Sequence, residues 1–243
     1  MRRRPLKRTR RILVAVTLVA AVAAGCTAGG LLDAVGVGGG GELSLETVVA
    51  GLKEALRVGT GNTVKAVSRA DGYWKNPRIR IPMPPELERV SSTLRNLGLG
   101  AKVDDFERKM NEAAEKAAVE AVPVFAGAIR DMTFEDARRI LKGGGSAATD
   151  YFRRKTTATL SAKYTPIVRR STERVGAVRR YNEIMERYRK IPLVPKPKFD
   201  LDEYVTRKAL EGLFTVLAEE ERKIRENPAA RTTELLRKVF GAR

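Results

Sequence analysis

The residue types that carry most enzyme chemistry are scarce in this sequence. The 243-residue chain has no histidine and a single cysteine, Cys26. Without histidine there can be no Ser-His-Asp triad, no Cys-His dyad and no HExxH zinc site. A single cysteine rules out intramolecular disulfides and cysteine-rich metal sites. We therefore expect no resident metal or cofactor, and the sequence assigns no residue to a catalytic role.

Carboxylates are the remaining candidates for catalysis. Asp104-Asp105 and Glu135-Asp136 are adjacent acidic pairs. Side chains of neighbouring residues on a helix point about 100° apart, so neither pair forms a ready acid/base site. Both pairs are more typical of the acids that stabilise the first turn of a helix.

Basic residues are abundant and unevenly distributed. The chain has 47 Lys and Arg against 29 Asp and Glu, a formal net charge of +18. Residues 151–198 hold 14 basic and three acidic residues, whereas the rest of the chain after residue 25 has 26 of each. We interpret this segment as a basic helical face that binds anions. Its candidate ligands are Arg153, Arg154, Arg169, Arg170, Arg174, Arg179 and Arg180. The alternative is a solvated face whose charge is balanced by acidic helices packed beside it.

A glycine-rich turn provides a second, more local candidate for anion binding. Gly143-Gly144-Gly145-Ser146 precedes a helical segment, and a helix that begins in this way leaves free backbone N–H groups. Arg153 and Arg154 lie one to two turns further on. Asp150 in the first turn would repel an anion, so a simple loop with a helix cap is the alternative.

The first 25 residues have the pattern of an export signal. Residues 2–11 carry seven positive charges, and an apolar run follows from residue 12 to residue 25. This run is shorter than the roughly 20 residues that span a bilayer, which favours a cleaved signal peptide. A loose resemblance to a twin-arginine motif at residues 9–13 leaves the export route open.

The end of this signal resembles the lipobox of bacterial lipoproteins. The sequence Val22-Ala23-Ala24-Gly25-Cys26 places the only cysteine directly after small residues. The resemblance implies that Cys26 is acylated and becomes the new N-terminus. Thr27, in place of aspartate, implies the periplasmic face of the outer membrane. Residues 26–41 are then a lipidated cysteine and a flexible glycine-rich tether. A plain secretory cleavage after Ala23 is the alternative.

The elements that must position these residues are helical. Apolar residues recur at helical spacing from residue 43 onward. Four prolines in residues 71–85 and three in residues 191–199 predict two extended arms. We predict an all-α, single-domain multi-helix bundle of about eight helices over residues 42–243, with two proline-rich connecting arms. The expected helices are 45–67, 85–97, 102–130 with a kink or restart at Pro123, 134–142, one from Ser146 or Thr149, one from Thr165-Pro166 to about 190, 202–225 and 229–240.

Six motifs, in order, resemble a known family. Together they are similar to the exported proteobacterial proteins of domain-of-unknown-function family 4197. The resemblance covers roughly residues 43–241. It implies an exported and mostly helical domain, and it carries over no catalytic residues. The motifs are Gly51-Leu52-Lys53-Glu54-Ala55-Leu56, Ile79-Arg80-Ile81-Pro82-Met83-Pro84, Leu97-Gly98-Leu99-Gly100, Met132-Thr133-Phe134-Glu135-Asp136-Ala137, Ala148-Thr149-Asp150-Tyr151-Phe152-Arg153 and Asn227-Pro228-Ala229-Ala230-Arg231-Thr232-Thr233.

These observations favour a non-enzymatic binding or envelope-organising lipoprotein that uses the basic helical face. Its expected partners are the membrane, reached through the lipid anchor, and an anionic lipid, a glycan or another envelope protein. Export argues against nucleic acid as a partner. The alternative is an enzyme that acts on an envelope polymer through an unrecognised carboxylate-based site.

Overall fold

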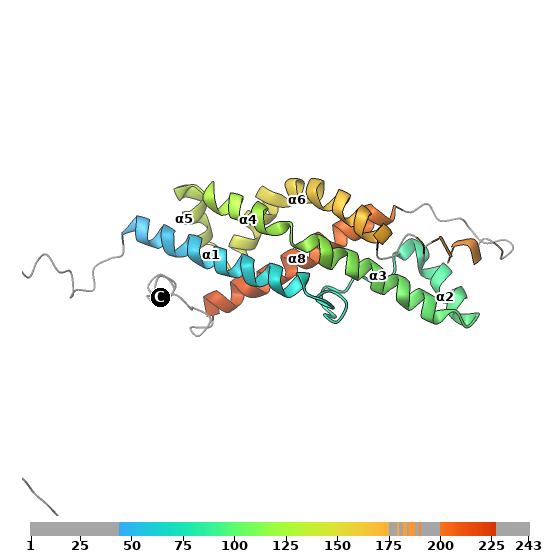
Figure 1. Ribbon diagram of the computed structural model, residues 1–243. Helices are drawn as coiled ribbons and strands as arrows, with labels where there is room; N and C mark the ends of the chain where they lie inside the picture. Colours follow the sequence, from blue (N-terminus) through green and yellow to red (C-terminus); the bar gives the residue numbers. More distant parts are fainter. Residues whose placement is uncertain are drawn as a thin grey trace, which may run out of the picture. The chain divides into compact units, whose positions relative to one another are not determined.

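The described part of the chain is mostly helical. The computed structural model describes residues 44–174, 179, 182–183, 185–187, 190 and 200–226. The chain divides into two units, residues 1–42 and residues 43–243. No strand occurs among the described residues, so the all-α prediction is confirmed. The elements (Figure 1) are α1 (Leu45–Ser68), the 3-10 helix η1 (Pro85–Leu87), α2 (Glu88–Asn96), α3 (Gly100–Ala118), α4 (Ala121–Arg130), α5 (Phe134–Lys142), α6 (Ala147–Arg174) and α8 (Leu201–Glu226).

The predicted first helix forms a single element. Ser44 caps α1, since the N–H of Thr47 donates to its hydroxyl at 3.2 Å. Gly59 lies inside the helix without breaking it and faces α8, where a Cβ would lie in ordinary van der Waals contact, 3.4 Å from the Ile224 Cδ1.

Helix α8 lies at the centre of the core. It packs against α6, α1 and α3 (Figure 1). Its buried residues include Leu213, Phe214 and Leu217, and the ring of Phe214 lies 6.4 Å from that of Phe125 on α4. No helix among the described residues has both the length and the apolar character needed to cross a bilayer.

The first proline arm is confirmed. Residues 71–84 form no α-helix. Ile79, Ile81 and Met83 are buried, and Trp74 is partly buried. Tyr73 is fully buried, and its hydroxyl donates to the carbonyl of Ala209 on α8 at 2.7 Å. The arm therefore belongs to the core and is more than a surface connection.

The expected restart at Pro123 is also found. Helix α3 ends at Ala118 and α4 begins at Ala121. Pro123 is the third residue of α4. N–H groups in the first turn of a helix have no partner within the helix, so the N–H that proline lacks is not needed there. Thr133 and Asp136 form a capping box at the start of α5, which ends before Gly143.

The prediction that a new helix begins at Thr165-Pro166 is wrong. Helix α6 runs without a break from Ala147 to Arg174 with Pro166 inside it. Proline removes the hydrogen bond to the carbonyl of Ala162, four residues earlier. Both Pro166 and Ala162 are exposed, so water can satisfy that carbonyl. The hydrogen bond that the proline removes therefore lies on the solvent-exposed side of α6.

Several predictions lie outside the described residues. These are the signal peptide, Cys26 with its tether, most of the second proline arm and the helix expected over 229–240.

Candidate functional site

The glycine-rich turn leads into a helix end that the chain itself caps. The N–H groups of Ala148 and Thr149 donate to the carboxylate of Glu221 on α8 at 3.0 and 2.8 Å. The Thr149 hydroxyl also lies 2.8 Å from it. A carboxylate is the anion that a helix N-terminus attracts, so Glu221 occupies the place proposed for an external anion.

Arg225 balances the charge of Glu221. Its guanidinium lies 2.8 Å from the Glu221 carboxylate and also donates to the carbonyl of Ile140 on α5 at 3.0 Å. Glu221 is only 8% exposed. A buried carboxylate is tolerable when it is paired and fully hydrogen-bonded, and both conditions hold here. This cluster joins α5, α6 and α8, which is a structural role.

The basic residues of α6 differ in their surroundings. Arg169 pairs with Asp202 of α8 at 2.9 Å. Among the other described basic side chains of this helix, none forms an ion pair with a described carboxylate. All are exposed; they are Arg153, Arg154, Lys155, Lys163 and Arg170. The only acidic residues of α6 are Asp150 and Glu173 near its two ends, and neither forms an ion pair with these side chains.

A groove between α6 and α8 contains two of the predicted anion ligands. It has a volume of about 490 Å³. Arg153 lies over the Phe214 ring at 4.7 Å, and Arg169 is held by Asp202. The groove has three arginines and four carboxylates on its walls, so its net charge does not favour an anion. The charged lining residues are Arg153, Arg169, Arg207, Asp200, Asp202, Glu203 and Glu211.

A second groove, between α4 and α6, has a different charge. Its volume is about 510 Å³. Lys155 and Lys163 line the α6 side, with Thr159 between them at the same helical spacing. The one acid in its lining, Asp131, pairs with Arg130 at 3.2 Å. This groove therefore presents unneutralised positive charge beside an apolar helix.

The structure describes only some of the remaining candidate anion ligands. Arg154 borders a small hollow with Asp136, Arg139 and Asp150, and no direct ion pair joins it to either acid. Arg179 is exposed. The side chain of Arg174 and the whole of Arg180 lie outside the described residues, as does Cys26.

The two acidic pairs have structural partners. Asp104 lies 2.6 Å from Arg95, and Asp136 closes the capping box with Thr133. Burial raises the pKa of Asp136, but the hydrogen bonds from Thr133 and the charges of Lys155 and Arg139 outweigh it, so the pKa is lowered overall. No group of three or more potential metal ligands occurs among the described residues.

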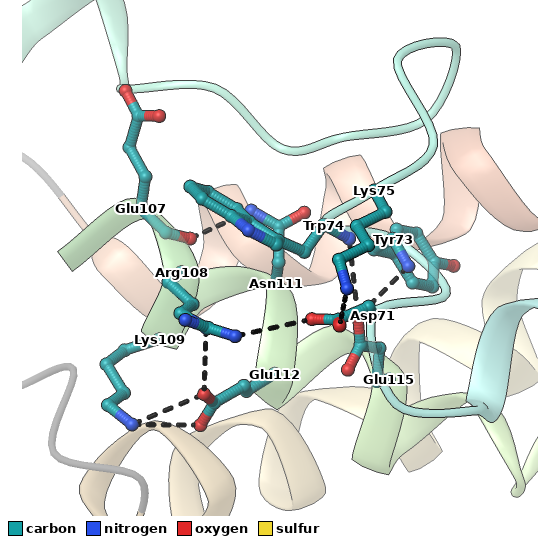
Figure 2. A network of polar contacts seen from close by, with 10 residues as sticks. All are labelled: Asp71, Tyr73, Trp74, Lys75, Glu107, Arg108, Lys109, Asn111, Glu112 and Glu115. Carbon is teal, nitrogen blue, oxygen red and sulfur yellow. Dashed lines mark hydrogen bonds and ion pairs between the residues drawn. The ribbon is translucent and has the colours of Figure 1, made fainter. Parts of the chain in front are cut away.

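The polar cluster in Figure 2 holds the arm onto α3. The N–H groups of Tyr73 and Trp74 donate to one carboxylate oxygen of Glu115 at 3.0 and 3.3 Å. Asn111 donates to the carbonyl of Ile81 and accepts from its N–H, at 2.9 and 2.8 Å. Two side chains of α3 thus supply the hydrogen bonds that a neighbouring strand would give to an extended segment.

Charged residues surround this attachment. Asp71 has a φ of 59°, a conformation that most side chains avoid. Its carboxylate lies 2.7 Å from Lys75 and 3.6 Å from Arg108 (Figure 2). Burial raises the pKa of Glu115, against the lowering effect of its backbone hydrogen bonds. This carboxyl points at backbone amides of the arm and away from any groove described above.

Sequence reasoning did not single out Asn111, Glu115 or Glu221. A signal was present, because each stands in an otherwise apolar helical stripe. Asn111 and Glu115 share the buried face of α3 with Met110 and Ala114. A polar side chain at such a position must have a buried partner. The pattern could have revealed that they were structural, but not which distant backbone groups they bind.

Comparison with known proteins confirms the family resemblance. A family model described as protein of unknown function (DUF4197) matches residues 42–241. No curated protein and no solved structure matches the chain. Because the family match spans nearly all of the chain after the predicted signal and tether, the chain belongs to the DUF4197 family.

Proposed function

We propose that this protein is a lipid-anchored envelope protein that binds an anionic surface or polymer, without catalysis, through the outer face of α6. The observation that carries the proposal is the set of exposed basic side chains on α6 that lack a carboxylate partner among the described residues. They are Arg153, Arg154, Lys155, Lys163 and Arg170. Elsewhere, ion pairs of 2.6–2.9 Å hold Arg57, Arg78, Arg80 and Arg95.

Unpaired charges of one sign on one helix create a local positive potential. Such a potential attracts polyanions and raises the rate at which they bind, and salt screens it. The proposal therefore places the ligand on the solvent-exposed side of α6. Anchoring at Cys26 would keep that face at the membrane, in our proposal at the periplasmic face of the outer membrane.

The binding part of the proposal is tested with a soluble polyanion that contains no lipid. We expect the chain from residue 27 onward to bind dextran sulfate at low salt and to release it at high salt. Arg154→Glu with Arg170→Glu should abolish this binding. The control, Lys65→Glu with Lys142→Glu, makes the same change of net charge at exposed lysines of α1 and α5. Equal loss in both variants would show that net charge, and not α6, governs binding.

The anchor is tested separately in the full-length chain. Cys26→Ser should abolish incorporation of labelled fatty acid and release the protein from the membrane fraction. Two acyl chains hold a protein firmly, whereas electrostatic attraction alone is reversed by salt. Unchanged labelling of the serine variant would rule out acylation at Cys26.

A further inference from the structure

Helix α4 has an unusual surface for an element of a folded domain. Its sequence, AVPVFAGAIR, carries one charged residue, yet only Ala121 and Phe125 are buried. Val122 is 53% exposed, and Val119, just before the helix, is 52% exposed. Pro123 and Ala126 are exposed as well. An apolar ridge defined by Val119, Val122, Pro123 and Ala126 therefore faces outward.

Two lysines line the groove that borders this ridge at Pro123. Lys155 and Lys163 line the groove between α4 and α6, opposite Pro123, Val124 and Gly127. They are eight residues apart, which corresponds to about 12 Å along a helix. Two contacts fix α6 in this register: Tyr151 donates to the carbonyl of Ala128, and Tyr164 to that of Ala118. The lysine row thus runs beside α4.

Charges of both signs lie around the ridge, and they differ in whether they are paired. Asp131 at one end is paired with Arg130. Glu120 lies at the other end, where its charge adds to the larger effect of burial in raising the pKa of Tyr164. Burial raises the pKa of Asp136 and the charge of Lys155 helps to lower it, but these two residues form no ion pair. Lys155 and Lys163 have no carboxylate bound to them among the described residues.

Together, small aliphatic side chains and flanking lysines fit one kind of partner. We propose that the α4–α6 face docks on an anionic phospholipid bilayer, with Val119 and Val122 entering the interface and Lys155 and Lys163 contacting lipid phosphates. This inference rests on the proposed function and names its ligand. Lysine stems lie along apolar surface while their charges reach the headgroups. Protein interfaces instead favour aromatic and arginine anchors, which the ridge lacks.

The first experiment separates the apolar ridge from general electrostatics. The chain from residue 27 onward retains the whole of the compact unit that begins at residue 43. It is mixed with vesicles of phosphatidylglycerol and phosphatidylcholine, and binding is measured by co-sedimentation. Val119→Asp with Val122→Asp should weaken binding at least tenfold. The control, Leu45→Asp with Leu97→Asp, adds the same charge at exposed residues 50% and 61% accessible and should have a much smaller effect.

The second experiment tests the lysine row. Each lysine near an anionic surface contributes about a fivefold factor in binding, so Lys155→Gln with Lys163→Gln should weaken it roughly 25-fold. Lys65→Gln with Lys142→Gln is the matched control. Vesicles of phosphatidylcholine alone should bind none of these proteins strongly. Equal effects of the two lysine pairs would overturn the assignment of this face.

A single-site probe gives a direct readout of insertion. The chain from residue 27 onward contains no cysteine, so Val122→Cys provides one unique labelling site. An environment-sensitive fluorophore there should shift to shorter wavelength when anionic vesicles are added, and the same label at Leu97→Cys should not. No shift at residue 122, with vesicle binding intact, would overturn the inference.

Comparing binding to dextran sulfate with binding to phosphatidylglycerol vesicles tests this inference separately from the proposed function. A chain that binds dextran sulfate through α6 but ignores phosphatidylglycerol vesicles contradicts bilayer docking and leaves polyanion binding standing. A chain that binds neither contradicts both.

Discussion

At the scale of single residues, polar side chains inside the core constrain the path of the backbone most strongly. Glu115 is 6% exposed and holds two N–H groups of the arm. Asn111 performs the same task for Ile81. These residues fix where an irregular segment lies, because a buried amide without a partner is costly. Their side chains therefore determine a backbone path that hydrophobic packing alone would leave loosely defined.

Glu115 gives a prediction about pH. Because burial raises its pKa in the folded chain, the folded chain holds this proton more tightly than the unfolded chain. Its contribution to stability is complete below the ordinary value of 4.5 and is lost as the pH rises through the folded-state pKa. Glu115→Gln keeps one oxygen acceptor and removes the titration. The free energy of unfolding of the wild type, relative to this variant, should fall between about pH 4 and about pH 7.

Urea unfolding at both pH values measures this difference. A difference that is constant or rises with pH would contradict the raised pKa. Glu115→Ala serves as the reference, because it leaves two arm amides without an acceptor and should cost about 1–3 kcal/mol at either pH.

Gly212 gives a second prediction at this scale. A Cβ at this position would lie 2.7 Å from the Tyr73 Cε1 and 3.1 Å from the Ile79 Cβ. Gly212→Ala should therefore destabilise the protein by about 1–3 kcal/mol through overpacking. Gly61 also lies inside a helix, but a Cβ there would meet no atom within 4 Å. Gly61→Ala should stabilise by about 0.5–1 kcal/mol, since alanine is the better helix former. Thermal unfolding of the two variants should move in opposite directions.

At the scale of elements, the sequence was informative wherever a local rule determines structure. The capping box at Thr133, the restart around Pro123 and the apolar contacts of the first arm were all predictable from short-range chemistry. Thr165-Pro166 has the same local chemistry as a helix start, yet tertiary packing of Tyr164 and Val168 keeps α6 continuous through it. Local signals cannot reveal such an override, because the decisive contacts are made by α3, α4 and α8.

The candidate site was predictable in part. The basic character of α6 could be read directly from residues 151–174, but its division into paired and unpaired charges could not. Arg169 meets Asp202, which is 33 residues away in the sequence, and Lys155 meets no described carboxylate. The cap on α6 depends on Glu221, more than 70 residues away. Such partners follow from the packing of helices and leave no trace in local composition.

The start of α6 therefore gives the element-scale prediction. Glu221→Ala would leave the N–H groups of Ala148 and Thr149 without their acceptor and Arg225 without its carboxylate. We expect a loss of about 3–5 kcal/mol, as for other broken buried ion pairs. Glu220→Ala, the neighbouring change, removes exposed contacts to Lys223 and Asn62 and should cost less than about 1 kcal/mol.

Urea unfolding compares these two variants, and amide hydrogen exchange locates the change. Faster exchange confined to the first turns of α6 is expected in Glu221→Ala. If both variants unfold at the same urea concentration, Glu221 does not stabilise the helix start.

At the scale of the whole molecule, α8 joins the other helices into one core. It contacts α1, α3 and α6, and its Phe214 is buried near Phe125 of α4. We predict that a chain ending at residue 199 does not unfold cooperatively, because each remaining helix loses apolar surface that only α8 covers. Circular dichroism during heating measures this. A sharp transition in the shortened chain would show that α1–α6 form an independent core.

The hydrogen bond from Tyr73 to Ala209 has a consequence for the order in which the protein is made. Its two partners are separated by 136 residues, so the bond forms only after most of the chain has been synthesised. Until α8 has been synthesised, the ring of Tyr73 lacks its packing partner. Contacts between residues so far apart in the sequence are slow to form. A nascent chain whose core is incomplete stays partly unfolded, and its exposed apolar surface is accessible to chaperones. If the N-terminal signal directs the chain to a translocation channel that admits only unfolded proteins, the late formation of the Tyr73–Ala209 hydrogen bond would help to keep the chain unfolded until it is exported.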